Sequence, residues 1–271
     1  MKHTMRLVAA SVLAMSVASA AVADPISDAV KSEHRSADAK LRDEFRNPQQ
    51  TLRFFGVEPS DTVVEIWPGG GWYTDILAPL VGKDGQLIAA HFHVDSDTRD
   101  YYRESLSQFK QKVAEHAPYK GIQITAFDPT DALDIAKPGS ADVVLTFRNV
   151  HNWYFNAGED GMSNAFNAFF KALKPGGVLG LVEHQLPESY ADGQMEKSGY
   201  MKKSVVVKAA EAAGFKLEAE SAINANPLDT SDHPKGVWTL PPSLRLNDQD
   251  QDKYLAIGES NRMTLKFVKP K

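Results

Sequence analysis

Residues 63–74 decide the fold, and they read Val-Val-Glu-Ile-Trp-Pro-Gly-Gly-Gly-Trp-Tyr-Thr. The first four are mostly apolar and β-branched, which is typical of a buried parallel strand. The three glycines let the backbone turn sharply and approach a ligand with no side chain in between. The residues that follow suit a helix. A strand, a glycine turn and a helix in this order predict an open α/β sheet that binds a ligand beyond the carboxyl ends of its strands.

The rest of the chain alternates between strand-like and helix-like segments. We expect strands at residues 62–67, 86–91, 122–127, 141–147, 178–183, 215–221 and 262–268. We expect helices at residues 28–45, 50–55, 72–80, 99–115, 160–173 and 202–213. Alternation of this kind predicts a parallel sheet with right-handed crossovers. No helix is evident between the last two strands, so they should pair antiparallel at one edge of a seven-stranded, Rossmann-like α/β sheet.

The N-terminus has the features of a secretory signal peptide. Lys2 and Arg6 supply positive charge, residues 7–17 are apolar, and residues 21–23 read Ala-Val-Ala, which suits cleavage. The apolar run is shorter than the ~20 residues that span a bilayer. We therefore expect a signal peptide at residues 1–23, an N-terminal helical extension at 24–56 and the main domain at 57–271. The mature protein should be periplasmic or secreted, with no stable membrane insertion.

Composition excludes several kinds of site. The chain has no cysteine, which excludes disulfides, thiolate nucleophiles and Cys-ligated metal centres. The formal net charge is −5 and no long basic run is present, so nucleic acid is not an expected partner. Nothing in the sequence indicates an oligomeric state.

The expected strands, the glycine loop and the Lys-Pro-Gly-Gly turn at residues 174–177 resemble class I S-adenosylmethionine-dependent methyltransferases. Residues 68–74, 148–153 and 236–242 read PGGGWYT, RNVHNW and GVWTLPP. These segments are similar to those of an exported group of predicted methyltransferases. The resemblance implies S-adenosylmethionine as the cofactor and methyl transfer to a small-molecule acceptor.

The resemblance also implies which residues bind that cofactor. Glu65 holds the acidic position that opens the first motif. Gly69 and Gly71 match its second and third glycines, with Gly70 between them. Asp128, after the third expected strand, matches the residue that usually faces the adenine.

Three features depart from the family pattern or from its setting. Trp67 stands where the first glycine is expected, and His91 stands where an acid usually binds the ribose, although Asp95 is near enough to replace it. An exported enzyme would also need S-adenosylmethionine outside the cell that makes it. The alternative is an exported non-catalytic ligand-binding protein, or a repurposed enzyme with or without a metal, on the same fold. A dinucleotide site is disfavoured because Thr74 occupies the place of its third glycine.

Several histidines follow expected strands and should lie at one edge of the sheet. His151 and His184, with Glu183 beside them, are metal-ligand types, but no short His-x₃-His spacing is present, so we predict no metal site. A general-base role suits a histidine better, because its ordinary pKa is near 6.5. We expect Asn149, His151 and His184 to face the acceptor as catalytic residues.

Two further segments border the expected pocket. Arg42, Arg46 and Arg53 in the N-terminal helices could bind an acidic substrate, but we favour surface pairs with neighbouring acids. Residues 226–242 form a long, partly apolar connection that should fold over the pocket mouth. Asp229 and His233, with Asp232, are then candidate substrate contacts.

Overall fold

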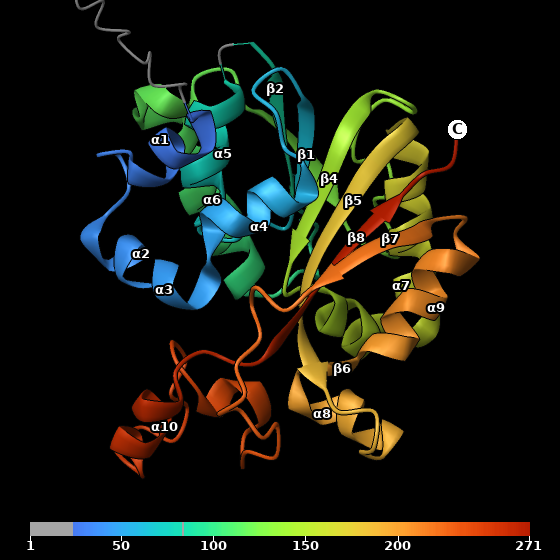
Figure 1. Ribbon diagram of the computed structural model, residues 1–271. Coiled ribbons are helices and arrows are strands. Elements are labelled where there is room, and N and C mark those ends of the chain that lie inside the picture. The colour runs from blue at the N-terminus through green and yellow to red at the C-terminus, as the bar shows by residue number, and fades with distance from the viewer. Residues whose placement is uncertain (1–23, 83) are drawn as a thin grey trace, which may run out of the picture.

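The computed structural model describes residues 24–82 and 84–271, so the expected signal peptide lies outside the described residues. A mixed β-sheet forms the centre (Figure 1). Its strands are β1 (Thr62–Ile66), β2 (Gln86–Phe92), β3 (Gln123–Phe127), β4 (Ala141–Phe147), β5 (Leu173–Leu186), β6 (Met201–Lys202), β7 (Lys216–Ser221) and β8 (Arg262–Val268). The main path runs β3-β2-β1-β4-β5-β8-β7, and the short β6 pairs with β5 off this path.

The direction of the strands confirms the expected architecture. β3, β2, β1, β4 and β5 are parallel to their neighbours. β8 lies between β5 and β7 and is antiparallel to both. The last two strands therefore close one edge of the sheet as an antiparallel pair, as expected, although the segment between them does contain a short helix at Gln251–Ile257 that the sequence did not indicate. This is the α/β Rossmann-like methyltransferase fold.

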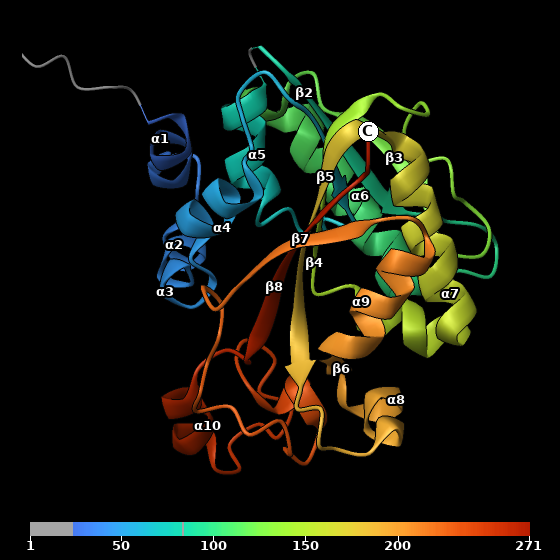
Figure 2. The same ribbon diagram turned by 45° about the vertical axis from the view of Figure 1, so that its right-hand side comes forward.

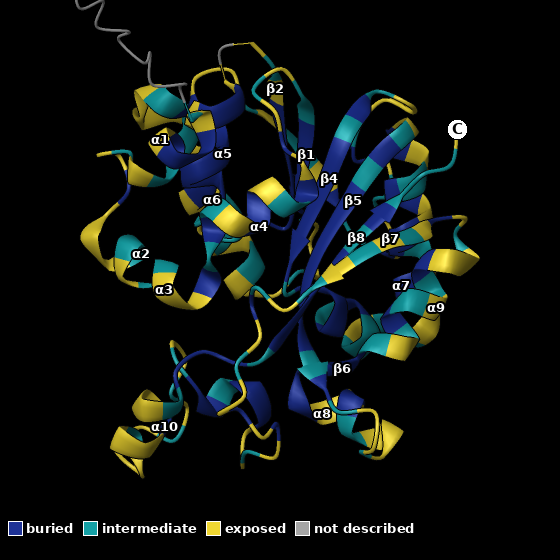
Figure 3. Ribbon diagram, viewed as in Figure 1, coloured by how far each residue is buried: buried dark blue, intermediate teal, exposed yellow. Residues whose placement is uncertain are grey.

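Helices cover both faces of the sheet (Figure 2). They are α1 (Pro25–Lys31), α2 (Ala37–Leu41), α3 (Asp43–Arg46), α4 (Pro48–Phe55), α5 (Thr74–Val81), α6 (Asp100–Glu115), α7 (Val150–Ala172), α8 (Met195–Ser198), α9 (Lys203–Ala212) and α10 (Gln251–Ile257). Short 3₁₀ helices occur at Ala117–Tyr119, Asp192–Gln194 and Gly236–Thr239. α1, α4 and α5 pack on one face, and α7 and α9 pack on the other. The central strands are buried on both sides (Figure 3), which explains their continuous apolar sequences.

The N-terminal helical region differs from the expectation. Residues 28–45 form parts of three short helices rather than one, because Ser36 accepts a hydrogen bond from the Ala39 N–H and starts a new helix. Asn47 then adopts a left-handed conformation, which ends α3 and allows Pro48 to begin α4. These breaks direct the side chains of α3 toward the C-terminal part of the chain.

The carboxyl edge of the sheet is covered by the segment between β7 and β8, which includes α10 and lies below the sheet in Figure 1. α7 starts at Val150, but its helical geometry is interrupted at Ala157 and Gly158, so its second part agrees with the helix expected at residues 160–173. Among residues 24–82 and 84–271, every helix is too short or too polar to cross a membrane.

Candidate functional site

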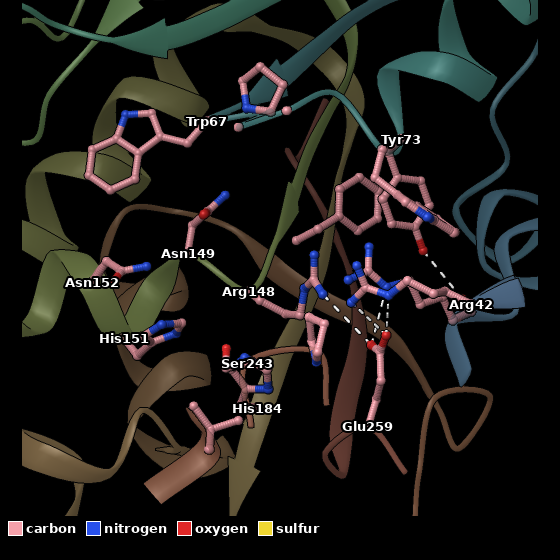
Figure 4. A pocket seen from close by; sticks show the side chains of 18 of the residues that line it. Arg42, Trp67, Tyr73, Arg148, Asn149, His151, Asn152, His184, Ser243 and Glu259 are labelled. Carbon is pink, nitrogen blue, oxygen red and sulfur yellow. Dashed lines mark hydrogen bonds and ion pairs between the residues drawn. The ribbon is translucent and has the colours of Figure 1, made fainter. Parts of the chain in front are cut away.

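A pocket of about 1050 Å³ lies beyond the carboxyl ends of β1, β4 and β5 (Figure 4). Its walls come from α2 and α3, the glycine loop after β1, the turn between β4 and α7, and two C-terminal segments at residues 237–245 and 259–262. The predicted ligand edge is therefore hollow, and it is bordered by the N-terminal helices and by segments from the C-terminal part of the chain.

The glycine loop has the open conformation that the sequence predicted. Gly69 and Gly71 have φ angles of +58° and +82°, which favour glycine. A Cβ atom on Gly69 or Gly70 would meet nothing within 4 Å, so the backbone there is accessible. A Cβ on Gly71 would lie 3.3 Å from Lys112 Nζ, and Lys112 Nζ also donates to the Gly70 carbonyl at 3.1 Å. The loop is thus accessible on one side and supported by α6 on the other.

Glu65 lies buried at the base of this loop. Its carboxylate accepts a hydrogen bond of 2.6 Å from the Thr74 hydroxyl. Burial raises the pKa of Glu65 to about 7, against the opposing effect of that hydrogen bond. The carboxyl group therefore carries only part of a charge at neutral pH.

Trp67 occupies the place of the first glycine and keeps a glycine-like backbone, with φ of +45°. Its indole N–H donates to the Phe127 carbonyl at 2.8 Å, and its ring packs 4.9 Å from the Phe92 ring and 6.0 Å from the Trp153 ring. The side chain therefore extends from the end of β1 to the end of β3. It separates the main pocket from a second hollow of about 260 Å³ that contains Asp128, because Trp67 and Tyr102 line both.

The residues expected to bind the ribose and the adenine also have other contacts. His91 is fully buried and its Nε2 lies 3.1 Å from the Gly69 carbonyl oxygen. Burial lowers the pKa of His91 to about 4, so the ring is neutral where the family pattern needs an acid. The carboxylates of Asp95 and Asp128 accept hydrogen bonds from their own loops, through Thr98 and Thr130 respectively.

These contacts test the fit of S-adenosylmethionine. Glu65 and the accessible glycine loop suit the methionine end of that molecule. The adenosine end lacks the partners that the family pattern provides, because the Trp67 indole lies between the main pocket and the hollow that contains Asp128, and His91 offers no carboxylate to the ribose.

His151, Glu183 and His184 form a second group at the pocket. Glu183 Oε2 accepts the N–H groups of Val150 and His151 at 2.6 and 3.3 Å, so the carboxylate stabilises the start of α7. Glu183 Oε1 accepts the His184 N–H and lies 2.9 Å from His151 Nδ1. His151 is thus held as the Nδ1–H tautomer, with the lone pair of Nε2 on the other side of the ring.

His184 is held in a similar way. Its Nδ1 lies 2.5 Å from the Ser260 hydroxyl oxygen, and its ring centre is 5.3 Å from that of His151. Burial, and then the nearby positive groups, keep the pKa of His184 well below its ordinary value. Asn149 also lines the pocket, but its amide donates to the Ile66 carbonyl at 2.9 Å and so connects the ends of β1 and β4.

The same group contains residue types that bind metal ions. The donor atoms of His151, Glu183 and His184 lie within 4.8 Å of one another. Both oxygens of Glu183 are already occupied by N–H donors, so a metal could use only the Nε2 atoms of the two histidines. We therefore describe the group as a carboxylate-supported histidine pair.

Four arginines converge on Glu259, and they include two that we expected at the surface. Arg42 and Arg46 contact the Glu259 carboxylate at 2.6 and 3.2 Å. Arg262 also pairs with it, and Arg148 Nη1 lies 3.9 Å away. The surface expectation was wrong for these two because their acidic partner lies more than 200 positions along the chain, beyond the reach of helical periodicity. Arg53 does form an exposed pair, with Asp24.

Mutual effects shift the pKa values in this cluster. Burial would raise the pKa of Glu259, but the arginines outweigh it and lower the value to about 2. Burial, followed by repulsion from Arg262, lowers the pKa of Arg148 to about 10, and burial also lowers that of Arg46. Arg148 and Glu259 therefore remain charged at neutral pH, and four guanidinium groups around one carboxylate make this end of the pocket positive.

The long C-terminal connection was predicted in part. Val237 and Trp238 line the pocket, and the Trp238 ring lies 6.1 Å from that of His151. Asp229 is instead buried, where it accepts hydrogen bonds from the Tyr200 hydroxyl and the Asn261 N–H and lies 2.8 Å from His233 Nε2. Neither Asp229 nor His233 lines the main pocket.

Comparison with solved structures agrees with this architecture. A SAM-dependent methyltransferase from Aquifex aeolicus superimposes with a TM-score of 0.55 and 14% identity, over 92% of this chain and 100% of that one. The [4+2]-cyclase SpnF gives a TM-score of 0.54 and 13% identity, over 91% and 92% of the two chains. A possible exported protein from Bordetella parapertussis gives 0.50 and 16%, over 90% and 78%.

Identities this low establish the fold alone. The structural neighbours include class I SAM-dependent methyltransferases, and the chain has their fold. No protein-family model and no curated protein matches the sequence.

Proposed function

We propose that this chain is an exported small-molecule enzyme that keeps the methyltransferase fold and uses His151 as a general base. The observation that carries the proposal is the contact of 2.9 Å between His151 Nδ1 and the buried Glu183 carboxylate. A carboxylate in this position fixes the tautomer and stabilises the imidazolium that forms when Nε2 accepts a proton.

The surroundings of His151 support this role. Its neighbour His184 has a lowered pKa and is neutral, so it adds no second positive charge beside the base at neutral pH. The Trp238 ring borders the same part of the pocket, 6.1 Å from the His151 ring, and adds an apolar wall beside the base. Residues 1–23 have the sequence features of a signal peptide, which supports export.

In this proposed function, S-adenosylmethionine does not occupy the position that it has in class I methyltransferases. The reason is the Trp67 indole, which lies between the glycine loop and Asp128. The fold itself is compatible with chemistry other than methyl transfer, since one structural neighbour is named a cyclase.

A second candidate is S-adenosylmethionine-dependent methyl transfer to a small molecule. The observation in its favour is the accessible backbone of Gly69 and Gly70 above Glu65, which suits the methionine part of the cofactor. Asp95 or Asp128 would then bind the adenosine after Trp67 moved. Asn149, His151 and His184 would face the acceptor in this case too.

Calorimetry with the purified mature chain separates the two candidates. If the first is correct, S-adenosylmethionine binds in the millimolar range or not at all. Micromolar binding that is lost in a Gly71→Asp variant would instead favour methyl transfer. The Gly139→Asp variant is a matched control, because Gly139 also has a positive φ and lies outside the pocket.

A further inference from the structure

The main pocket has two chemically different ends (Figure 4). His151 and His184 lie at one end. Arg42 and Glu259 lie at the other, and Arg148 lies between the two. A ligand that spans the pocket would therefore meet a base on one side and guanidinium groups on the other.

The guanidinium end contains more positive charge than the protein neutralises. Four arginines share the single carboxylate of Glu259. Arg46 and Arg262 are almost completely buried and hold that carboxylate directly. Burying unbalanced charge is costly, so a fold that keeps this arrangement gains from an anion that completes it.

Arg148 is the arginine that is most available to such an anion. Its side chain keeps about a quarter of its surface, 24%, open to the pocket. Within the described residues, its guanidinium group has no hydrogen-bond acceptor, and the nearest oxygen of Glu259 is 3.9 Å away. The group therefore faces the pocket with its donors unused, although it is charged.

The backbone at Arg148 supports the same interpretation. Its φ angle is +62°, a left-handed conformation that is unfavourable for a long side chain. A hydrogen bond of 2.7 Å from its N–H to the Val182 carbonyl holds it there, next to Glu183 on β5. Strain of this kind is concentrated at functional sites, where the surrounding structure maintains it.

We propose that Arg148 and Arg42 bind a carboxylate or phosphate group of the ligand, while Arg46, Arg262 and Glu259 hold these two arginines in place. The planar guanidinium group matches the paired oxygens of either anion. The inference rests on the proposed function only in assigning the opposite end of the ligand to His151. The substrate class is then a small molecule with an anionic group at one end and a transferable proton at the other.

The experiment measures anion binding without turnover. The mature chain is titrated with inorganic phosphate and with succinate, at constant ionic strength maintained with chloride, and binding is followed by calorimetry and by the unfolding temperature. We expect at least one anion to bind, about tenfold more weakly in an Arg148→Met variant. Preference for phosphate or for succinate identifies which of the two groups the ligand carries.

Two controls keep the inference testable. Arg53→Met removes an exposed arginine outside the pocket and should leave the affinity unchanged. If Arg148→Met does not fold, Arg42→Lys tests the same site, since it keeps the charge but loses the planar fork. The inference is overturned if neither anion binds the wild type, or if the variant that folds binds as tightly as wild type.

Anion binding at the arginine site can be tested separately from the proposed role of His151. His151→Gln should leave anion affinity within about twofold while it removes the base. Micromolar binding of S-adenosylmethionine would overturn the proposed function and leave the arginine site intact.

Discussion

The arginine cluster leads to a quantitative prediction for Glu259→Gln. The substitution keeps the size and most hydrogen-bonding capacity of the side chain but removes the carboxylate charge that four arginines share. The variant therefore measures how much the fold depends on this one negative charge.

The magnitude follows from the pKa of Glu259, which is lowered from 4.5 to about 2. A difference of ~2.5 units corresponds to about 3 kcal/mol of stability at neutral pH. This agrees with the ~3–5 kcal/mol lost when one partner of a buried ion pair is removed. For a chain of this size, the unfolding temperature should fall by roughly 6 to 12 °C.

The pH dependence has a defined sign. The carboxyl pKa is lower in the folded protein than in the unfolded one, so its contribution is present above pH 4.5 and is lost as the pH falls toward 2. The stability of wild type should therefore fall between pH 4.5 and pH 2 because Glu259 becomes protonated. The Glu259→Gln variant should lack this part of the pH dependence.

Urea unfolding followed by circular dichroism provides the measurement. Glu218→Gln is the control, because Glu218 pairs with Lys266 at the surface and its side chain is 49% exposed, so its loss should change stability by less than about 0.5 kcal/mol. A Glu259→Gln variant within about 1 kcal/mol of wild type at pH 7 would refute the argument that the arginines depend on this carboxylate.

Three other substitutions test the rest of the site. Glu65→Gln should stabilise the protein by up to about 3 kcal/mol at pH 8. Burial raises the pKa of Glu65 from 4.5 to about 7, so the stability that the protonated carboxyl group contributes is lost as the pH rises through that value. Equal urea midpoints of variant and wild type at pH 8 would contradict this. Trp67→Gly should cost about 3 kcal/mol in lost ring packing and should allow adenosine to bind in calorimetry. Wild-type affinity for adenosine equal to that of the variant would contradict the view that the indole blocks the site. Glu183→Gln should cost about 2 kcal/mol, since it removes a charge at the start of α7. It should also release the His151 tautomer in ¹⁵N NMR, and an unchanged His151 spectrum would argue against the proposed base.

The sequence was sufficient to predict the seven strands of the main path, but not the short β6 or the full length of β5. Strands β4 and β8 have the predicted boundaries, because buried strands have a local apolar pattern and sharp turn signals. The glycine loop was also placed correctly, because three consecutive glycines after an apolar strand are a local turn signal. The helix expected at residues 28–45 was not predicted correctly, since the cap at Ser36 interrupts a charged segment that has little apolar periodicity of its own. The next helix, expected at residues 50–55, agrees with α4.

The site was less predictable than the fold. His151 and His184 were expected at one edge because both follow parallel strands, and they do lie together. The partnership of Arg42 with Glu259 depends on the completed fold, which no local pattern encodes. The direction of the Trp67 indole depends in turn on a hydrogen bond to Phe127, on a strand that is distant in sequence.

The ion pairs between α3 and Glu259 also have a consequence for assembly. Arg46 and Glu259 are 213 positions apart, so the positive end of the pocket can form only after nearly the whole polypeptide is available. If the leader directs N-terminus-first passage across a membrane, Arg46 arrives long before the carboxylate that it needs. The cavity would then be completed in the destination compartment, and the first anions it meets would be those found there.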